Sequence, residues 1–310
     1  MDAALKFPTT PKAVKAASLK LRKRMSVEQA FQAIVRSCID QVQANEAGVT
    51  RFHDMESLHQ MRVGLRRLRA ALAMFDDVLP SPDEIKSELG WMMDQLAQAR
   101  DWDVLVSSTL PQVEGAIEEP NALAELRQAT QEKIGALHAR AADAVSLPRF
   151  QQLLSRLGQW LDRRGWREDL SPKGKTRAKM RVVDFAGGIL EQERDRLLKR
   201  GKQLKSATPE ERHRVRIASK RTRYAAEFFA SLYPGKQMRP YVAAISALQH
   251  ELGAMNDATI GRRLLDELCE GCDGLRAEAA LVRGYLAAGN AQGVARLRRV
   301  WKKLVSLDAP

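Results

Sequence analysis

The feature that most constrains the fold of this chain is a short pattern of charged residues that occurs once in each half. The first copy is His59–Arg69 and the second is His213–Arg223, and both follow H-x-x-R-[VI]-x-x-[RK]-R-x-R. The agreement continues beyond the pattern, because Phe75 and Phe229 occupy matching positions. A duplicated segment of this kind indicates that the chain is built from two similar structural units.

Each copy is predicted to form an amphipathic helix with a ridge of cations along one edge. At about 100° per residue, the ridge of the first copy consists of His59, Arg62, Arg66 and Arg69. The ridge of the second copy consists of His213, Arg216, Lys220 and Arg223. Apolar residues such as Met61, Leu65 and Val215 fall on a neighbouring arc and would face a core. Arg67 and Arg221 lie further round each helix and are expected on its solvent side.

The rest of the chain is predicted to be helical as well, so the expected fold class is all-α. Apolar residues recur every three or four positions, whereas alternating β-branched stretches bounded by turns are absent. The expected helices cover approximately 27–42, 56–78, 84–105, 122–145, 148–164, 175–201, 209–232, 240–269 and 275–305.

Breaks in the helical pattern predict how the chain is organised. Residues 1–20 hold prolines and scattered lysines and are expected to be poorly ordered or to form a basic arm. A first helical half is expected at 21–165, a linker rich in Gly and Pro at 166–174, and a second half at 175–310. No apolar run is long enough to cross a bilayer and the N-terminus resembles no secretory signal, so a cytoplasmic protein without a membrane partner is expected.

The charge pattern predicts an anionic partner. The chain has a formal net charge of +13, which attracts anions at long range. Cations three or four residues apart on one helix repel each other, so each ridge needs compensation. Either Asp101, Asp103, Glu251 and Asp257 neutralise the ridges internally, or a ligand does. Arginine matches phosphate oxygens with two parallel hydrogen bonds, and a cation about every 5 Å along the axis suits a linear chain of phosphates.

Catalytic and metal chemistry are not expected. Cys269 and Cys272 form a lone C-x-x-C, whereas a structural zinc site needs about four ligands, and Cys38 is expected to be a buried small hydrophobe. A magnesium-dependent phosphohydrolase needs clustered carboxylates, and the sequence holds no dense acidic cluster. A phosphotransfer histidine is a weaker alternative, because each histidine lies within a dense ridge of cations that repeats and is more typical of anion coordination. Both histidines are expected to titrate near neutral pH. We therefore predict a binding protein with no cofactor, no metal and no catalytic residue.

Four segments resemble the CHAD family, which is named for a histidine-bearing α-helical domain. These segments are Leu58–Phe75, Ala99–Val104, His213–Phe229 and Leu248–Asp257, and the likeness extends over essentially 20–305. The resemblance implies two pseudo-symmetric helical bundles of roughly four helices each, with a basic groove or cavity. It also implies that this groove binds inorganic polyphosphate and that the protein associates with polyphosphate granules.

By position, the resemblance assigns polyphosphate binding to residues of both patterns. Those residues are His59, Arg62, Arg66, Arg67, Arg69, His213, Arg216, Lys220, Arg221 and Arg223. The main alternative is a non-specific nucleic-acid or polyanion binder, because charge alone does not separate these ligands. Nucleic-acid modules usually add stacking aromatics, and Tyr224 is the one aromatic beside the ridges. The sequence leaves the oligomeric state, the preferred polymer length and the purpose of binding open.

Overall fold

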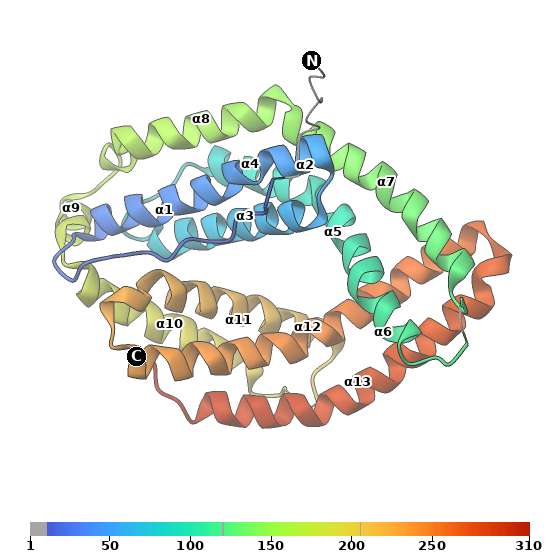
Figure 1. The fold of residues 1–310 in the computed structure, drawn as a ribbon. Helices are drawn as coiled ribbons and strands as arrows, with labels where there is room; N and C mark the ends of the chain where they lie inside the picture. The colour runs from blue at the N-terminus through green and yellow to red at the C-terminus, as the bar shows by residue number, and fades with distance from the viewer. Residues whose placement is uncertain (1–10, 120, 205) are drawn as a thin grey trace, which may run out of the picture.

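The computed structural model describes residues 11–119, 121–204 and 206–310, and the regular elements within them are helices. In the first part of the chain these are α1 (Val27–Ala44), α2 (Glu46–Phe52), α3 (Met55–Phe75), α4 (Asp83–Gln95), α5 (Ala97–Val104), α6 (Leu110–Glu114), α7 (Ala124–Ser146) and α8 (Pro148–Arg163). In the second part they are α9 (Pro172–Lys179), α10 (Val182–Gly201), α11 (Pro209–Phe229), α12 (Gly235–Gly271) and α13 (Arg276–Val305). The predicted all-α class is confirmed (Figure 1).

The two helices that carry the repeated pattern begin at strong capping signals. Asp54 caps α3 by accepting a hydrogen bond from the Ser57 amide at 2.7 Å. Thr208 caps α11 in a reciprocal arrangement with Glu211, in which each side chain accepts from the other residue's amide. Such caps satisfy amides that the first helical turn leaves free, and each contributes about 1 kcal/mol. They fix where both cation ridges start.

The matching phenylalanines join the two halves in one apolar core. Phe75 on α3 and Phe229 on α11 are both fully buried, with ring centroids 6.2 Å apart. Phe75 also contacts Phe31 on α1 at 5.1 Å and Phe185 on α10 at 4.8 Å. Burying each such ring contributes about 2–3 kcal/mol. The repeat therefore places α3 and α11 against a shared core with their cationic edges on the same side.

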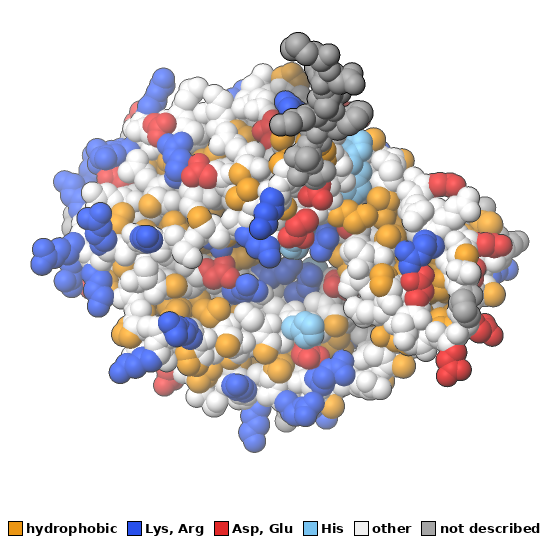
Figure 2. Space-filling model, viewed as in Figure 1, with side chains coloured by type: hydrophobic (Ala, Val, Ile, Leu, Met, Phe, Trp, Pro, Cys, Tyr) orange, Lys and Arg blue, Asp and Glu red, His pale blue; other side chains and the backbone are white. Residues whose placement is uncertain are grey.

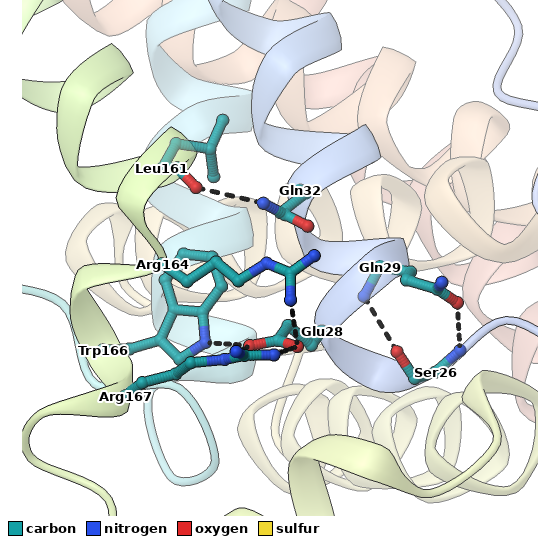
Figure 3. Close-up of polar contacts among 8 residues, drawn as sticks. All are labelled: Ser26, Glu28, Gln29, Gln32, Leu161, Arg164, Trp166 and Arg167. Atoms are coloured by element: carbon teal, nitrogen blue, oxygen red, sulfur yellow. Dashed lines mark hydrogen bonds and ion pairs between the residues drawn. The ribbon is translucent and has the colours of Figure 1, made fainter.

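A polar cluster at the start of α1 anchors the segment that follows α8 (Figure 3). Glu28 accepts a hydrogen bond from the Trp166 indole at 2.9 Å and two from Arg167 at 2.6 and 2.7 Å. Arg164 lies 3.6 Å from the same carboxylate. The Arg167 hydrogen bond is the main reason that the pKa of Glu28 is lowered. Part of 166–174, predicted as a linker, is thus packed onto the first half.

Several predicted helices differ from the structure. The helix expected at 175–201 is two helices, α9 and α10, and the short helices α2 and α6 were not predicted. The helix expected at 84–105 is two helices, α4 and α5, that meet at Leu96. The periodicity does not reveal this break, because Leu96 keeps the helical region of backbone space and is itself fully buried. The helix expected from Pro240 begins earlier, at Gly235. Pro240 lies near its N-terminus, where the missing amide removes a single backbone hydrogen bond.

The described part of the N-terminal arm is an extended strap, 11–21, fastened at both ends. Val14 exchanges two hydrogen bonds with the side chain of Asn45, both at 2.9 Å. The Leu21 amide donates to Ser231 Oγ at 2.9 Å, and this hydroxyl donates back to the Leu21 carbonyl at 3.2 Å. The expectation for 1–10 lies outside the described residues. The strap links the end of α1 to the turn after α11 (Figure 1).

Candidate functional site

A cavity of about 1210 Å³ lies between α3 and α11, and its walls are strongly basic. Among the described residues, nine Lys and Arg side chains line it against three carboxylates. The cations are Lys15, Arg62, Arg66, Arg67, Arg100, Arg216, Lys220, Arg223 and Arg239. Figure 2 shows Lys and Arg side chains gathered in the hollow at the centre of this face. The two predicted ridges therefore face a common space.

The structure brings most of the predicted site residues together. The cavity is lined by His59, Arg62, Arg66, Arg67, His213, Arg216, Lys220 and Arg223. Arg69 is exposed and directs a guanidinium nitrogen to Met93 Sδ at 3.3 Å, outside the cavity. Arg221 also lies outside it and pairs with Glu193 on α10 at 2.8 Å. Helical periodicity predicts which residues share one side of a helix. Which of these residues line the cavity depends on how the neighbouring helices pack.

The prediction that Arg67 faces solvent is wrong, because this side chain is buried. Arg67 is only 3% exposed, and its guanidinium pairs with Glu227 on α11 at 2.6 Å. The same guanidinium lies over the Phe228 ring, 4.9 Å from the centroid. Glu227 also pairs with Arg223 at 2.7 Å. One carboxylate on α11 thus holds a cation from each copy of the pattern, a contact between distant segments that periodicity does not predict.

Arg67 and Arg221 differ because their local neighbours differ. Arg221 finds the buried carboxylate of Glu193 on the adjacent helix α10. The side chain beside Arg67 on α1 is Cys38, a buried thiol whose pKa burial raises to about 12. A neutral thiol does not neutralise a guanidinium, so Arg67 reaches across to the other half. The prediction that Cys38 is a buried small hydrophobe agrees with its burial.

Several cations of the cavity have no protein partner. Within the described part of the chain, Arg66 and Lys220 make no hydrogen bond or ion pair. The Nε atoms of Arg62 and Arg66 and the Nδ1 atom of His59 are buried without a hydrogen-bond partner. A buried polar group that lacks a partner costs about 1–3 kcal/mol. These groups leave part of the hydrogen-bonding capacity of the cavity wall unused.

The four carboxylates considered from the sequence neutralise the ridges only in part. Asp103 is fully buried and bonds His138 at 2.7 Å, and Glu251 pairs with Arg296 at 3.0 Å. Asp101 lies 3.3 Å from Arg263, and its charge also acts on the ridge cation Arg62. Asp257 approaches a second ridge cation, with 3.9 Å between its carboxylate and Arg216. Asp103 and Glu251 are thus committed to residues outside the ridges.

Crowding of cations lowers the pKa values of several of them. Burial first, and then Arg66 and Arg216, lower the pKa of Lys220 to about 6. Burial and the charge of Arg100 lower the pKa of His59 to about 4, so the expectation that this imidazole titrates near neutral pH is wrong for the empty site. Burial and Arg66 lower the pKa of Arg62 to about 10. Each shift means that the positive charge is disfavoured until an anion compensates it.

Sequence reasoning missed three of the cations. Arg100 lies in Ala99–Val104, one of the four segments that resemble the CHAD family, and this was the available signal. Lys15 reaches the cavity from the strap, and Arg239 reaches it from α12. Neither belongs to a repeated pattern, so only the tertiary structure reveals them. His213 sits at the edge of the site, with Nδ1 3.1 Å from Asn256 Oδ1.

The described residues hold no cluster of three or more His, Cys, Asp or Glu that could bind a metal ion. In the same part of the chain, Cys269 and Cys272 are free thiols. No helix there combines the length and the apolar character that crossing a membrane requires.

Comparison with known proteins places the chain among helical domains with this architecture. The family model described as "CHAD domain" matches residues 33–266. The crystal structure of the CHAD domain from the plant Ricinus communis aligns with a TM-score of 0.85 and 37% identity, over 96% of this chain and 98% of that one. PptA from Streptomyces chartreusis has a similar fold, with a TM-score of 0.65 and 14% identity, over 90% of this chain and 100% of that one. No curated protein matches.

Proposed function

The chain belongs to the CHAD domain family, and from this premise we propose that it binds inorganic polyphosphate in the cavity between α3 and α11. The observation that supports the proposal is the set of partly buried cations without protein partners, above all Arg66 and Lys220. Family resemblance names the ligand, and the cavity has the charge that this ligand requires.

The chemistry of the cavity fits a linear phosphate polymer. Guanidinium groups donate two parallel hydrogen bonds to the oxygens of one phosphate, whereas Lys220 acts as a point charge. Within each helix, ridge positions three or four residues apart are separated by about 5 Å along the axis. A chain of phosphates that runs between α3 and α11 would meet cations from both sides. Binding releases counterions from the polymer, so affinity falls as salt rises.

We propose binding rather than catalysis. His213 contacts Asn256 rather than a carboxylate that could orient it as a base or nucleophile. His59 has a pKa of about 4, so its imidazole is neutral at physiological pH and is surrounded by cations. Both are arranged as anion contacts. We further propose that the protein works in the cytoplasm, where polymer binding would place it on polyphosphate granules.

The decisive experiment is a competition titration at physiological salt. Labelled long-chain polyphosphate is bound to the protein and then challenged with RNA of matched charge. Displacement only at large excess of RNA supports polyphosphate recognition. Even competition would instead support a general polyanion binder, which is the second candidate. Among the described cavity-lining residues Tyr224 is the one Phe, Tyr or Trp, and it is largely buried, which disfavours base stacking.

Charge reversal tests the location of the site. The quadruple change Arg62→Glu, Arg66→Glu, Arg216→Glu and Lys220→Glu should abolish polyphosphate binding, because it turns both walls acidic. Circular dichroism should show unchanged helix content. A matched control reverses four exposed cations of α13 (Arg298, Arg299, Lys302 and Lys303), which lie outside the cavity. Equal affinity of the folded cavity variant and this control would refute the assignment.

A further inference from the structure

A second concentration of positive charge lies outside the cavity, where α9 meets the end of the strap. Residues 20–24 carry four Lys or Arg and residues 173–181 carry five, and neither range contains a carboxylate. All nine side chains are exposed. Figure 2 shows Lys and Arg crowded at the left end of this face, where Figure 1 places α9. We call these nine residues the outer patch.

Backbone pairing holds the two ranges of the outer patch together. The Val27 amide donates to the Met180 carbonyl at 3.0 Å, and the Val182 amide donates to the Met25 carbonyl at 2.8 Å. Ser26 and Arg181 form the bridge between these two bonds. The fold thus brings two basic segments, far apart in sequence, to one place and fixes them there.

The outer patch has little internal compensation. Within the described residues, the ion pair that it makes is between Arg181 and Asp184, at 2.9 Å. Arg177 directs one nitrogen to the Asp77 backbone carbonyl at 3.4 Å. Exposed cations are hydrated, and one alone would need no partner. Nine on two adjoining segments repel each other, and an extended anion would relieve that repulsion.

The strap makes the outer patch continuous with the cavity. Residues 15–19 of the strap line the cavity, and the patch begins with the next residue, Lys20. The strap ends in a turn at 22–25, where the Met25 amide donates to the Arg22 carbonyl at 2.9 Å. This turn lies beside the segment that follows α9. A polymer that leaves the cavity along the strap would meet these cations first.

We propose that the outer patch is a second polyphosphate-binding surface, which takes the part of a long chain that extends beyond the cavity. This inference rests on the proposed function, because it assumes that the cavity holds the same polymer. With this second surface, the protein would bind long polyphosphate chains more tightly than short ones. A chain short enough to lie inside the cavity does not reach α9, whereas a long chain contacts both surfaces at once and gains affinity from the second.

The test compares two ligands on three proteins. The ligands are tripolyphosphate and long-chain polyphosphate. The proteins are the wild type, the outer-patch variant Lys173→Glu, Lys175→Glu, Arg177→Glu and Lys179→Glu, and the α13 variant described above, which changes the net charge equally. Long-chain affinity should fall at least tenfold in the outer-patch variant alone, while tripolyphosphate affinity stays within about twofold in all three. With about 0.7 counterions released per contact on a single strand, the salt dependence of long-chain binding should lose a slope of about 3.

Each other outcome has a distinct meaning. Equal long-chain affinity of the outer-patch and α13 variants would overturn the second surface and leave the cavity assignment intact. Equal losses for both ligands in the outer-patch variant would also overturn it, because the patch would then act on the cavity through the general field. If the wild type binds neither ligand, the proposed function itself fails. Should the α9 changes unfold that helix, Arg22→Glu, Lys23→Glu and Arg24→Glu provide the same comparison from the strap side.

Discussion

At the scale of single residues, the cavity lowers the pKa of Lys220, so this amine can take up a proton when an anion binds beside it. Its pKa of about 6 in the empty site means that the amine is largely neutral at slightly alkaline pH. A phosphate beside it favours the charged form and raises its pKa. Polyphosphate binding should therefore take up protons, and affinity should weaken as pH rises from neutral to mildly alkaline. Calorimetry in buffers of different ionisation enthalpy measures the uptake.

A conservative variant isolates the contribution of Lys220 to that uptake. Lys220→Arg keeps the charge but stays protonated, since a guanidinium titrates far above neutral pH. It should bind polyphosphate with less proton uptake and a flatter pH profile. An identical uptake in wild type and variant would show that Lys220 is already charged in the empty cavity.

We expect Glu227 to stabilise the folded protein and to weaken polyphosphate binding. It pairs with buried Arg67 and with Arg223, so Glu227→Ala leaves a guanidinium in the protein without a counter-charge. Removing one partner of a buried pair costs about 3–5 kcal/mol, and we expect about 2 kcal/mol because Glu227 is partly exposed. The same change removes a carboxylate from the cavity and should tighten polyphosphate binding. Denaturant unfolding and a binding titration measure the two effects, and weaker binding would contradict this account.

At the scale of elements, the strap is the part of the site most open to testing. Residues 15–19 line the cavity between two fastened ends, at Asn45 and at Ser231. Deleting 1–20 should speed both association and dissociation of long-chain polyphosphate severalfold, because it removes cover from the cavity. The matched control changes Lys6, Lys12, Lys15 and Lys20 to Ala together, since it removes the lysine charges of 1–20 and keeps the strap. If this control reproduces the deletion, the strap contributes charge and does not cover the ligand.

The sequence predicts some helices more accurately than others. The pattern from His59 to Phe75 predicts α3 well, because periodicity and the repeat agree there. Apolar periodicity does not predict the break at Leu96, a buried residue that lies between α4 and α5. Nor does it predict that Arg67 turns inward, since that depends on Glu227 in the other half. Local signals define the helices, and contacts between halves define the site.

At the scale of the whole molecule, the repeat predicts that two cationic helices belong to one protein, whereas their facing arrangement comes from tertiary packing. Phe75 and Phe229 meet in the core, which turns both ridges toward the same cavity. Arg69 and Arg221 carry the same motif signal as their neighbours and nevertheless lie outside. Lys15 and Arg239 carry no motif signal and lie inside. A charge pattern therefore predicts a basic cavity better than it predicts which residues line that cavity.

The concentration of charge predicts how the whole protein responds to salt. Cations that repel each other around the empty cavity destabilise the folded state, and salt screens that repulsion. The unfolding temperature of the ligand-free protein should rise as salt is raised from a low to a physiological concentration. If polyphosphate binds as proposed, it should stabilise the folded protein through mass action, by about 2.7 kcal/mol at a hundredfold excess over its dissociation constant. That gain should shrink over the same salt range, because affinity falls as counterion release becomes less favourable. Calorimetric scans with and without polymer would show the two curves converging, and the cavity variant that carries four glutamates should lose both responses. If salt lowers the stability of the ligand-free protein, the charges around the cavity are compensated within the molecule and do not await an anion.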